Sequence, residues 1–123
     1  MARTANRHKG AVGEDLAAAC LISEGYRIIN RNYRTNTGEI DIIAENGAYL
    51  VFAEVKARFS DDYGYPAEAV TYNKRRMINK AAAEYIKRFR LFDAPVRFDV
   101  LEVYLDTGCV NHIENAFDSY LRY

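Results

Sequence analysis

Residues 39–58 read EIDIIAENGAYLVFAEVKAR and decide the fold, because two runs rich in Ile, Val, Phe and Tyr flank one short break. Residues of these types favour β-strands. The break, Asn46-Gly47, is the strongest short-range signal for a tight hairpin turn. We therefore predict one strand over Glu39–Ala44 and a second over Ala48–Ala57, joined by a two-residue turn.

Alternation along these strands is expected to gather charged side chains on one face. Side chains two apart on a strand share a face, so Glu39 joins Asp41 on the first strand. Glu54 and Lys56 share a face of the second strand in the same way. Pairing around a two-residue turn would place Glu39 opposite Glu54. It would place Asp41 opposite Phe52 and diagonal to Glu54, so that three carboxylates and one lysine meet.

The chemistry of this predicted cluster favours a bound divalent cation. Like charges that face each other destabilise a sheet, and the neighbouring Phe52 makes their burial less favourable still. Mg²⁺ or Mn²⁺ would offset the charge, since Mg²⁺ binds one or two carboxylates together with waters and phosphate oxygens. Asp41 and Glu54 are the natural ligands. Lys56 would position or deprotonate an attacking water, or offset charge that develops on a phosphate.

This pattern indicates metal-assisted phosphodiester hydrolysis. An alternative interpretation is that the same residues are ordinary solvated charges on a half-exposed strand. Glu-x-Lys alone is too short a pattern to separate the two.

The flanking sequence predicts further elements around the hairpin. Residues 10–24 are Ala-rich and stop at Gly25, which predicts a helix in which Glu14 is partly buried. Thr71 is suited to cap a second helix over residues 72–89. Strands are expected over residues 26–33, 96–105 and 110–113, and a loop over residues 59–66. The expected buried stripes are Val12, Leu16, Ala19 and Cys20 on the first helix, and Met77, Ile78, Ala81, Ala82, Tyr85, Ile86 and Phe89 on the second.

Length and composition bound the class of protein. A chain of 123 residues has room for one domain, residues 1–123, and 50% hydrophobic with 28% charged residues is typical of a globular protein. No apolar run approaches the roughly 20 residues that span a bilayer. Cys20 and Cys109 lie too far apart in the sequence to indicate a zinc site or a disulfide framework. We expect a soluble, cytoplasmic protein that has no membrane partner.

Charge is balanced overall but uneven along the chain. The net charge is zero, yet residues 74–90 hold seven basic residues and one acidic residue, a net +6. Helical spacing puts a set of these basic residues on one face, where they would contact a nucleic acid backbone in a salt-dependent manner. A merely solvated helix face is the alternative. The candidate nucleic-acid-binding residues are Arg76, Lys80, Lys87 and Arg90, with Arg58 from the central strand.

The segments together resemble a known group of enzymes. Asp41 with Glu54-Val55-Lys56 fits the signature of the PD-(D/E)xK nuclease superfamily, the fold of type II restriction enzymes and archaeal Holliday junction resolvases. More closely, the chain is similar to the bacterial YraN family of small predicted endonucleases. The matching segments are Gly13-Glu14, Gly25-Tyr26, Arg31-Asn32, residues 38–44 (GEIDIIA), residues 52–58 (FAEVKAR), Lys74 with Ala81-Ala82, and residues 97–100 (RFDV).

The resemblance implies the roles of individual residues. Asp41, Glu54 and the backbone carbonyl of Val55 would hold Mg²⁺ or Mn²⁺, and Lys56 would be the catalytic lysine. Glu14 would add a further acid from the first helix. Ile40 stands where the signature usually has proline, and Glu39 before it is an additional acid whose role the resemblance leaves open.

The resemblance also implies a fold and a reaction. The fold would be α/β and restriction-endonuclease-like, with a central mixed β-sheet flanked by helices. The reaction would be metal-dependent endonuclease cleavage of DNA, with branched DNA among the substrates and a homodimer to double the contact surface. Two alternatives stay open: a nucleic-acid-binding module of the same fold with little or no turnover, and a metal hydrolase of small phosphodiesters.

Overall fold

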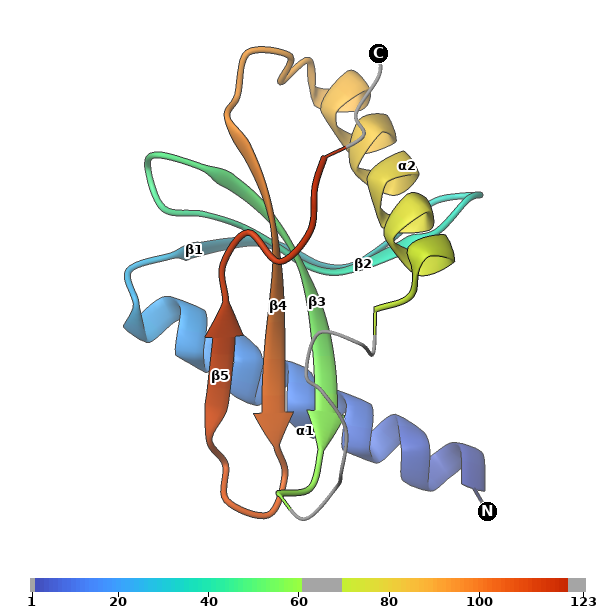
Figure 1. Ribbon diagram of the computed structural model, residues 1–123, viewed down its shortest axis with the longest axis vertical. Coiled ribbons are helices and arrows are strands. Elements are labelled where there is room, and N and C mark those ends of the chain that lie inside the picture. Colours follow the sequence, from blue (N-terminus) through green and yellow to red (C-terminus); the bar gives the residue numbers. More distant parts are fainter. Residues whose placement is uncertain (1, 61–69, 120–123) are drawn as a thin grey trace.

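The computed structural model describes residues 2–60 and 70–119, with side chains from residue 10 onward. Its elements, in chain order, are α1 (Ala2–Ser23), β1 (Arg27–Arg34), β2 (Glu39–Glu45), β3 (Leu50–Arg58), α2 (Tyr72–Phe89), β4 (Val96–Tyr104) and β5 (Val110–Ile113). The five strands form one sheet in the order β1-β2-β3-β4-β5 (Figure 1). Only β3 and β4 pair in parallel, and the other neighbours are antiparallel.

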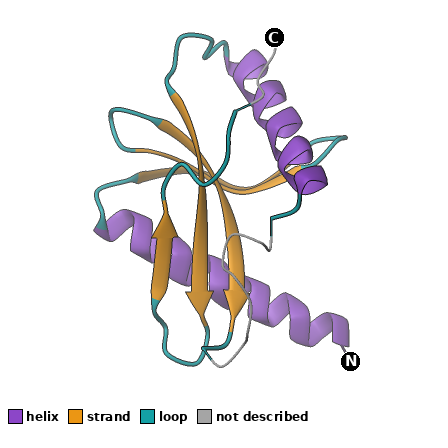
Figure 2. Cartoon of the chain, viewed as in Figure 1, coloured by secondary structure: helices purple, strands orange, loops and turns teal. Residues whose placement is uncertain are grey.

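One helix covers each face of the sheet, and each interface holds an apolar core (Figure 2). Alternate residues of β3 and β4 serve alternate cores, as expected for central strands that are buried on both faces. This mixed sheet between two helices confirms the predicted α/β class and is consistent with a restriction-endonuclease-like fold. The core on the α1 face includes Ala17, Leu21, Ile42, Val51, Ala53, Leu101 and Val103, and the core on the α2 face includes Ile40, Ile43, Phe52, Ile78, Ala82, Ile86, Phe98 and Val100.

The first helix begins earlier than predicted and buries a different stripe. It starts at Ala2 instead of residue 10, and it ends before Gly25, whose φ of +93° is the left-handed conformation predicted there. The expectation that Val12 and Ala19 are buried is wrong, since Val12 is 37% exposed and Ala19 is exposed as well. The contact stripe runs through Gly13, Ala17 and Leu21 instead. A Cβ atom at Gly13 would lie 3.2 Å from the Cβ of Ala57, so small residues let the helix approach β3 closely.

The second helix has the predicted bounds. Thr71 is its N-cap, and the Thr71 hydroxyl accepts a hydrogen bond from the Lys74 backbone N–H at 3.2 Å. Met77 and Phe89 are 40% and 48% exposed, so the expectation that they are buried is wrong. The stripe that faces the sheet is narrower than the apolar pattern suggested. Neither helix in the described part of the chain is long and apolar enough to cross a membrane.

The central hairpin has a different register from the predicted one. The Asn46 side chain accepts hydrogen bonds from the backbone N–H groups of Ala48 and Tyr49, at 3.0 and 2.8 Å. This Asx turn widens the connection to residues 46–49, and Glu45 pairs with Leu50. Consequently Phe52 lies opposite Ile43 and not opposite Asp41. The predicted pairing of Glu39 with Glu54 is also wrong. Each paired residue of β2 lies opposite a β3 residue two positions further along the chain than predicted.

The β1–β2 connection approaches α2 closely at Gly38. A Cβ atom added there would lie 2.8 Å from the backbone oxygen of Met77, so the connection or the helix would have to move. We expect Gly38→Ala to lower the free energy of unfolding by about 1–3 kcal/mol, as measured by urea denaturation. The control is Gly10→Ala, because an added Cβ at Gly10 meets nothing within 4 Å. An equal loss in both variants would show that the close approach is not the cause.

Candidate metal and phosphate site

The candidate site lies where β2 and β3 separate. Their last described pair toward this point is Ile42 with Ala53. Beyond it, the Asp41 carboxylate accepts a hydrogen bond from the backbone N–H of Val55 at 2.9 Å. The N–H and C=O of one strand residue point toward the same neighbouring strand, so the Val55 carbonyl faces this gap as well. The structure thus brings Asp41 and Val55, two of the predicted metal ligands, to one place.

A local distortion of the paired strands β1 and β2 sets the position of Asp41. Asn32 on β1 has a φ of +55°, a conformation that Asn adopts more readily than most residues. On β2, Ile40 packs into the core on the α2 face, whereas Ile42 packs into the core on the α1 face. Residues two apart on a regular strand would share a face. The alternation therefore reverses at Asp41, which lies at the change of face.

Asp41 is poorly placed to carry a negative charge without a cationic partner. Burial, followed by the nearby Glu54 carboxylate, raises the pKa of Asp41 to about 7, although the hydrogen bond from Val55 opposes the shift. A raised pKa caused by burial and a like charge is typical of functional carboxylates. A divalent cation beside Asp41 would remove this penalty on its ionised form.

Glu54 is buried, and its carboxylate lies close to the ammonium groups of two lysines. It is 3% exposed, and its Oε1 atom lies 2.6 Å from Lys74 Nζ and 3.8 Å from Lys56 Nζ. Lys74 comes from the first turn of α2, whereas Lys56 follows Glu54 on β3. The sequence indicated Lys74 only as part of a family pattern and gave it no place in the site. The unusually basic stretch over residues 74–90, which begins at Lys74, was the signal that could have drawn attention to it.

The two lysines differ electrostatically. Burial and the neighbouring Lys74 charge lower the pKa of Lys56 below its ordinary value, although Glu54 acts in the opposite direction. For Lys74, burial acts to lower the pKa, but the contact with Glu54 outweighs burial and raises it. Lys74 is thus the firmly charged partner of Glu54. Lys56 is the lysine that gives up a proton more readily.

Glu14 reaches the neighbourhood of the site from α1. Its side chain is 17% exposed, and burial raises its pKa. Its Oε1 atom is buried and has no hydrogen-bond partner within the described part of the chain, since the Arg31 Nε atom lies 3.9 Å away. The Glu14 charge also contributes to the raised pKa of Asp41. The structure therefore supports the expectation that Glu14 is a partly buried acid near Asp41.

These groups fit Mg²⁺ or Mn²⁺. The carboxylates of Asp41 and Glu54, the Val55 carbonyl and the orphaned Glu14 oxygen are the hard oxygen donors that Mg²⁺ prefers. Over residues 2–60 and 70–119, no three His, Cys, Asp or Glu side chains are grouped closely enough to enclose a metal ion. Mg²⁺ often takes only one or two carboxylates, with waters or substrate oxygens completing its shell, so Asp41 and Glu54 would be its side-chain ligands.

Two residues named from the sequence are engaged elsewhere. Glu39 lies exposed at the start of β2 and pairs with Arg34, with 3.7 Å between Arg34 Nε and Glu39 Oε2. Arg58 was a candidate for nucleic acid binding, and its guanidinium lies 3.2 Å from a carboxylate oxygen of the fully buried Glu102. The structure therefore does not bring Glu39 or Arg58 into contact with Asp41 or Glu54 in any described interaction.

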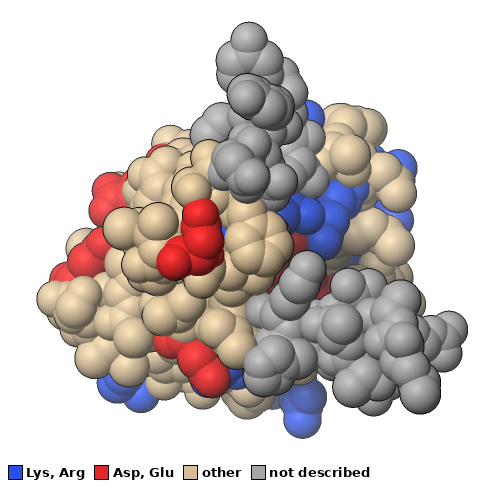
Figure 3. Space-filling model, turned by 90° about the horizontal axis from the view of Figure 1, so that it is seen from below, with Lys and Arg blue, Asp and Glu red and all other residues tan. Residues whose placement is uncertain are grey.

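The other four candidate nucleic-acid-binding residues are exposed, three of them on α2 and the fourth, Arg90, as its C-cap. The spacing of Arg76, Lys80 and Lys87 places them along one face of the helix, whereas Lys74 projects from the opposite side of its first turn toward Glu54. Figure 3 shows basic atoms lying against acidic atoms in the middle of one face of the molecule. The four residues are Arg76, Lys80, Lys87 and Arg90.

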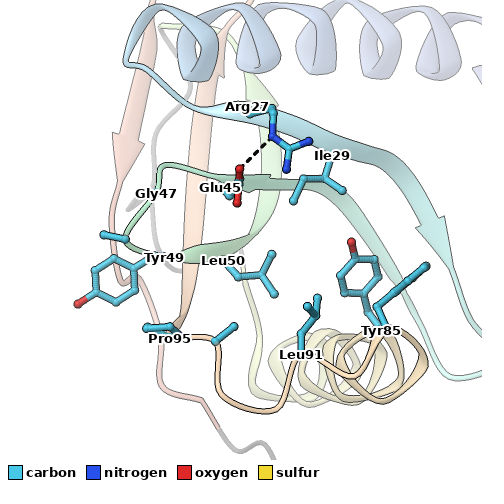
Figure 4. Close-up of a pocket in the computed structure, with 12 residues that line it drawn as sticks. Arg27, Ile29, Glu45, Gly47, Tyr49, Leu50, Tyr85, Leu91 and Pro95 are labelled. Atoms are coloured by element: carbon cyan, nitrogen blue, oxygen red, sulfur yellow. Dashed lines mark hydrogen bonds and ion pairs between the residues drawn. The ribbon is translucent and has the colours of Figure 1, made fainter.

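A groove of about 490 Å³ lies apart from the candidate site (Figure 4). Its walls include Leu50, Tyr85 and Leu91, and the ion pair of Arg27 with Glu45, 2.9 Å long, lies at its edge. No residue of the carboxylate and lysine cluster lines it. The groove therefore does not contribute to the proposed chemistry.

A second charged cluster ties the end of α1 to β4 and β5. His112 lies between two carboxylates, with Nδ1 2.6 Å from Glu24 and Nε2 2.6 Å from Asp99. Asp99 is fully buried and also accepts two hydrogen bonds from Arg97, at 2.9 and 2.8 Å. Arg97 and Asp99 belong to the last matching segment of the sequence, and the structure gives them this structural role.

The His112 cluster should make stability depend on pH. Burial acts to lower the pKa of His112, but its bonds to Asp99 and Glu24 outweigh burial and raise it above the ordinary value of 6.5. Its contribution is then complete below pH 6.5 and is lost as the pH rises through the raised pKa. We expect His112→Gln to lower the free energy of unfolding by about 1.5–3 kcal/mol at pH 6, and by less at pH 9, as measured by urea denaturation. A difference that is constant or grows with pH would contradict this assignment.

The fold and the site together define a class: a small α/β protein with one cluster of carboxylates and lysines where two strands of a mixed sheet separate. A model of the family described as "Uncharacterised protein family UPF0102" matches residues 13–103 of the chain. This span includes Glu14, Asp41, Glu54, Lys56 and Lys74. The chain belongs to this family, the YraN family that the sequence resembled.

Similar proteins from several bacteria span nearly the same length. A UPF0102 protein of Clostridioides difficile is 46% identical over 112 residues, which cover 91% of this chain and 98% of that relative. A UPF0102 protein of Clostridium acetobutylicum is 47% identical over 116 residues, with 91% and 95% covered. A UPF0102 protein of Geobacter sulfurreducens is 47% identical over 116 residues, with 92% and 91% covered. These names state the family and no activity.

Proposed function

We propose that this protein is a metal-dependent endonuclease that hydrolyses phosphodiester bonds of DNA at the Asp41, Glu54 and Lys56 cluster. The observation that carries the proposal is the meeting of two carboxylates from neighbouring strands beside a lysine. Lys56 Nζ lies 3.8 Å from Glu54 Oε1, and Asp41 has a pKa raised to about 7. A structural ion pair would not require a second carboxylate that ionises with such difficulty.

Asp41, Glu54 and the Val55 carbonyl would hold Mg²⁺ or Mn²⁺, and Glu14 would contribute its orphaned oxygen to the shell or to a bound water. When bound, such a cation polarises a phosphodiester and makes a coordinated water a better nucleophile. The hydrogen bond from the Val55 N–H fixes the orientation of the Asp41 carboxylate. The Asp41 carboxylate is thus preorganised, so this ligand would not have to reorient when a metal ion binds.

Lys56 would act either on the attacking water or on the phosphate. Its lowered pKa increases the fraction of neutral amine, which is the form that can accept a proton from a water. In its charged form, Lys56 would instead offset the negative charge that develops on the phosphate oxygens. Both roles need the short, fixed spacing between Glu54 and Lys56 on one face of β3.

The basic face of α2 supports DNA as the substrate. Its residues are exposed, whereas the first turn of the same helix brings Lys74 to Glu54 from the opposite side of the helix. Each Lys or Arg that contacts a phosphate makes binding weaker at higher salt. We therefore propose that Arg76, Lys80, Lys87 and Arg90 position the backbone, whereas the site itself holds the bond that is cut.

Cleavage of labelled DNA tests this function. Linear duplex, single-stranded, flap and four-way-junction DNAs are incubated with the protein and Mg²⁺ or Mn²⁺, and Asp41→Asn is compared with wild type. We expect metal-dependent cleavage by the wild type alone. Equal traces of cleavage by both proteins would indicate contamination and would contradict the proposal. Salt-sensitive DNA binding without cleavage would favour the nucleic-acid-binding module instead.

A further inference from the structure

Lys74 separates Glu54 from solvent. The Lys74 side chain is 45% exposed, the Glu54 side chain is 4% exposed, and their charged atoms lie 2.6 Å apart. The lysine therefore covers a buried carboxylate on one side and faces water on the other. A cation that reaches Glu54 from solvent meets the Lys74 ammonium group first.

The same Glu54 oxygen cannot keep this contact and bind a metal ion. Both lysines are closest to Oε1 of Glu54, and Lys74 is the only one of the two within hydrogen-bond distance of it. A divalent cation on this oxygen would lie very close to the ammonium group, and two positive charges at such separations repel strongly in a partly buried site. A metal ion on Glu54 Oε1 therefore requires Lys74 to take another partner.

We infer that Lys74 exchanges partners, leaving Glu54 for a phosphate of the bound nucleic acid, and thereby couples metal binding to DNA binding. The inference rests on the proposed function and adds a regulatory step to it. The Lys74 backbone is fixed by the Thr71 cap, so a change of partner involves only the flexible side chain. The proposed substrate is a nucleic acid, so its phosphate is the anion that we expect to replace Glu54 beside the half-exposed Lys74 side chain.

Lys56 is less suited to this exchange. It lies 3.8 Å from Glu54, is 26% exposed, and comes from a central strand. Removing Lys56 takes away one positive charge near Glu54 but leaves the Lys74 contact in place. A comparison of Lys74 with Lys56 variants thus separates the specific contact from the general effect of charge.

Metal titration by calorimetry tests the first half of the exchange. Mn²⁺ is added to wild type, Lys74→Met, Lys56→Met and Asp41→Asn without DNA. We expect Lys74→Met to bind Mn²⁺ about fivefold or more tightly than wild type, and Lys56→Met to change the affinity less. Lys74→Gln, which keeps a hydrogen-bond donor for Glu54, should lie between wild type and Lys74→Met. Equal affinities of Lys74→Met and wild type, or equal gains in the two Met variants, would overturn the inference.

Fluorescence anisotropy of a labelled DNA duplex tests the second half. DNA affinity is measured with and without saturating Ca²⁺, an oxygen-binding divalent cation, for wild type, Lys74→Met and Arg88→Met. Because coupling is reciprocal, Ca²⁺ should increase the DNA affinity of the wild type. In Lys74→Met this increase in affinity should be smaller by a factor of about five or more. Arg88→Met, which removes a charge near the other end of α2, should keep the wild-type gain. An equal gain in all three proteins would overturn the inference.

Failure of the proposed function and failure of the Lys74 exchange give different results in these experiments. If Mn²⁺ does not bind to the wild type, or binds as well to Asp41→Asn, the proposed metal site fails and the inference fails with it. If Mn²⁺ binding requires Asp41 but is indifferent to Lys74, the proposed function stands and only the exchange is wrong.

Discussion

Lys56→Met should lower the rate of metal-dependent DNA cleavage by at least about 100-fold, the loss typical of removing one group that stabilises charge in a transition state. Methionine keeps most of the length of the side chain and its packing but has no group that can accept a proton or offset charge. The readout is the single-turnover rate on the DNA that the wild type cuts best. Lys56 does not hold the metal in this account, so Mn²⁺ affinity should change far less than the rate.

Arg88→Met provides the control for loss of one positive charge. Arg88 is exposed near the end of α2, and its guanidinium lies 5.4 Å from the centre of the Phe89 ring. We expect this variant to keep a rate close to that of wild type. Cleavage by Lys56→Met at more than a tenth of the wild-type rate would show that Lys56 takes no part in the chemical step.

Asp41→Asn should stabilise the fold at neutral and alkaline pH while it abolishes metal binding. The pKa of Asp41 is raised from 3.8 to about 7 in the folded protein. Between these values the unfolded chain ionises while the folded chain stays protonated, so the wild type loses stability as the pH rises. Asparagine cannot ionise and retains an oxygen that accepts the Val55 N–H bond. We expect a gain of about 1–3 kcal/mol in the free energy of unfolding at pH 8.

The pH dependence is the sharper part of this expectation. Urea denaturation of wild type and Asp41→Asn should give similar stabilities near pH 4, a difference that grows up to about pH 7, and a constant difference above it. A gain of the same size at pH 4 would point to packing instead of ionisation. A loss of stability at pH 8 would show that ionised Asp41 is already well compensated, which would remove a main argument for a bound cation.

Local signals explain how much of the fold could be predicted. The Thr71 cap and the apolar periodicity after it are encoded within one segment, and α2 has the predicted bounds. The register of the central hairpin could not be predicted in the same way, because the Asn46 side chain forms an Asx turn that lengthens the connection. Asn-Gly alone favours the tighter turn, so the sequence led to pairing that was wrong by two residues.

The sequence predicted that Asp41 and Glu54 lie close together because both belong to one hairpin, but it missed the neighbours that tertiary structure supplies. Asp41 and Glu54 come from neighbouring strands of this hairpin and are close in the structure, although the register is shifted and the alternation reverses at Asp41. Lys74 comes from a helix, and only the folded chain shows its ammonium group 2.6 Å from Glu54. For Arg58, the pattern gave no indication of Glu102, which pairs with it across β3 and β4. Helix and cross-sheet partners depend on packing that a single segment does not encode.

The position of the metal ion is the central claim, and NMR line broadening by Mn²⁺ tests it most directly. Paramagnetic Mn²⁺ broadens the amide signals of residues near it, so the assigned spectrum of the wild type is followed as Mn²⁺ is added, with Asp41→Asn as the control. We expect the signals of residues 40–42 and 54–56 to broaden first, and to do so only in the wild type. Broadening that begins around Asp99 and His112, or that is the same in Asp41→Asn, would contradict it.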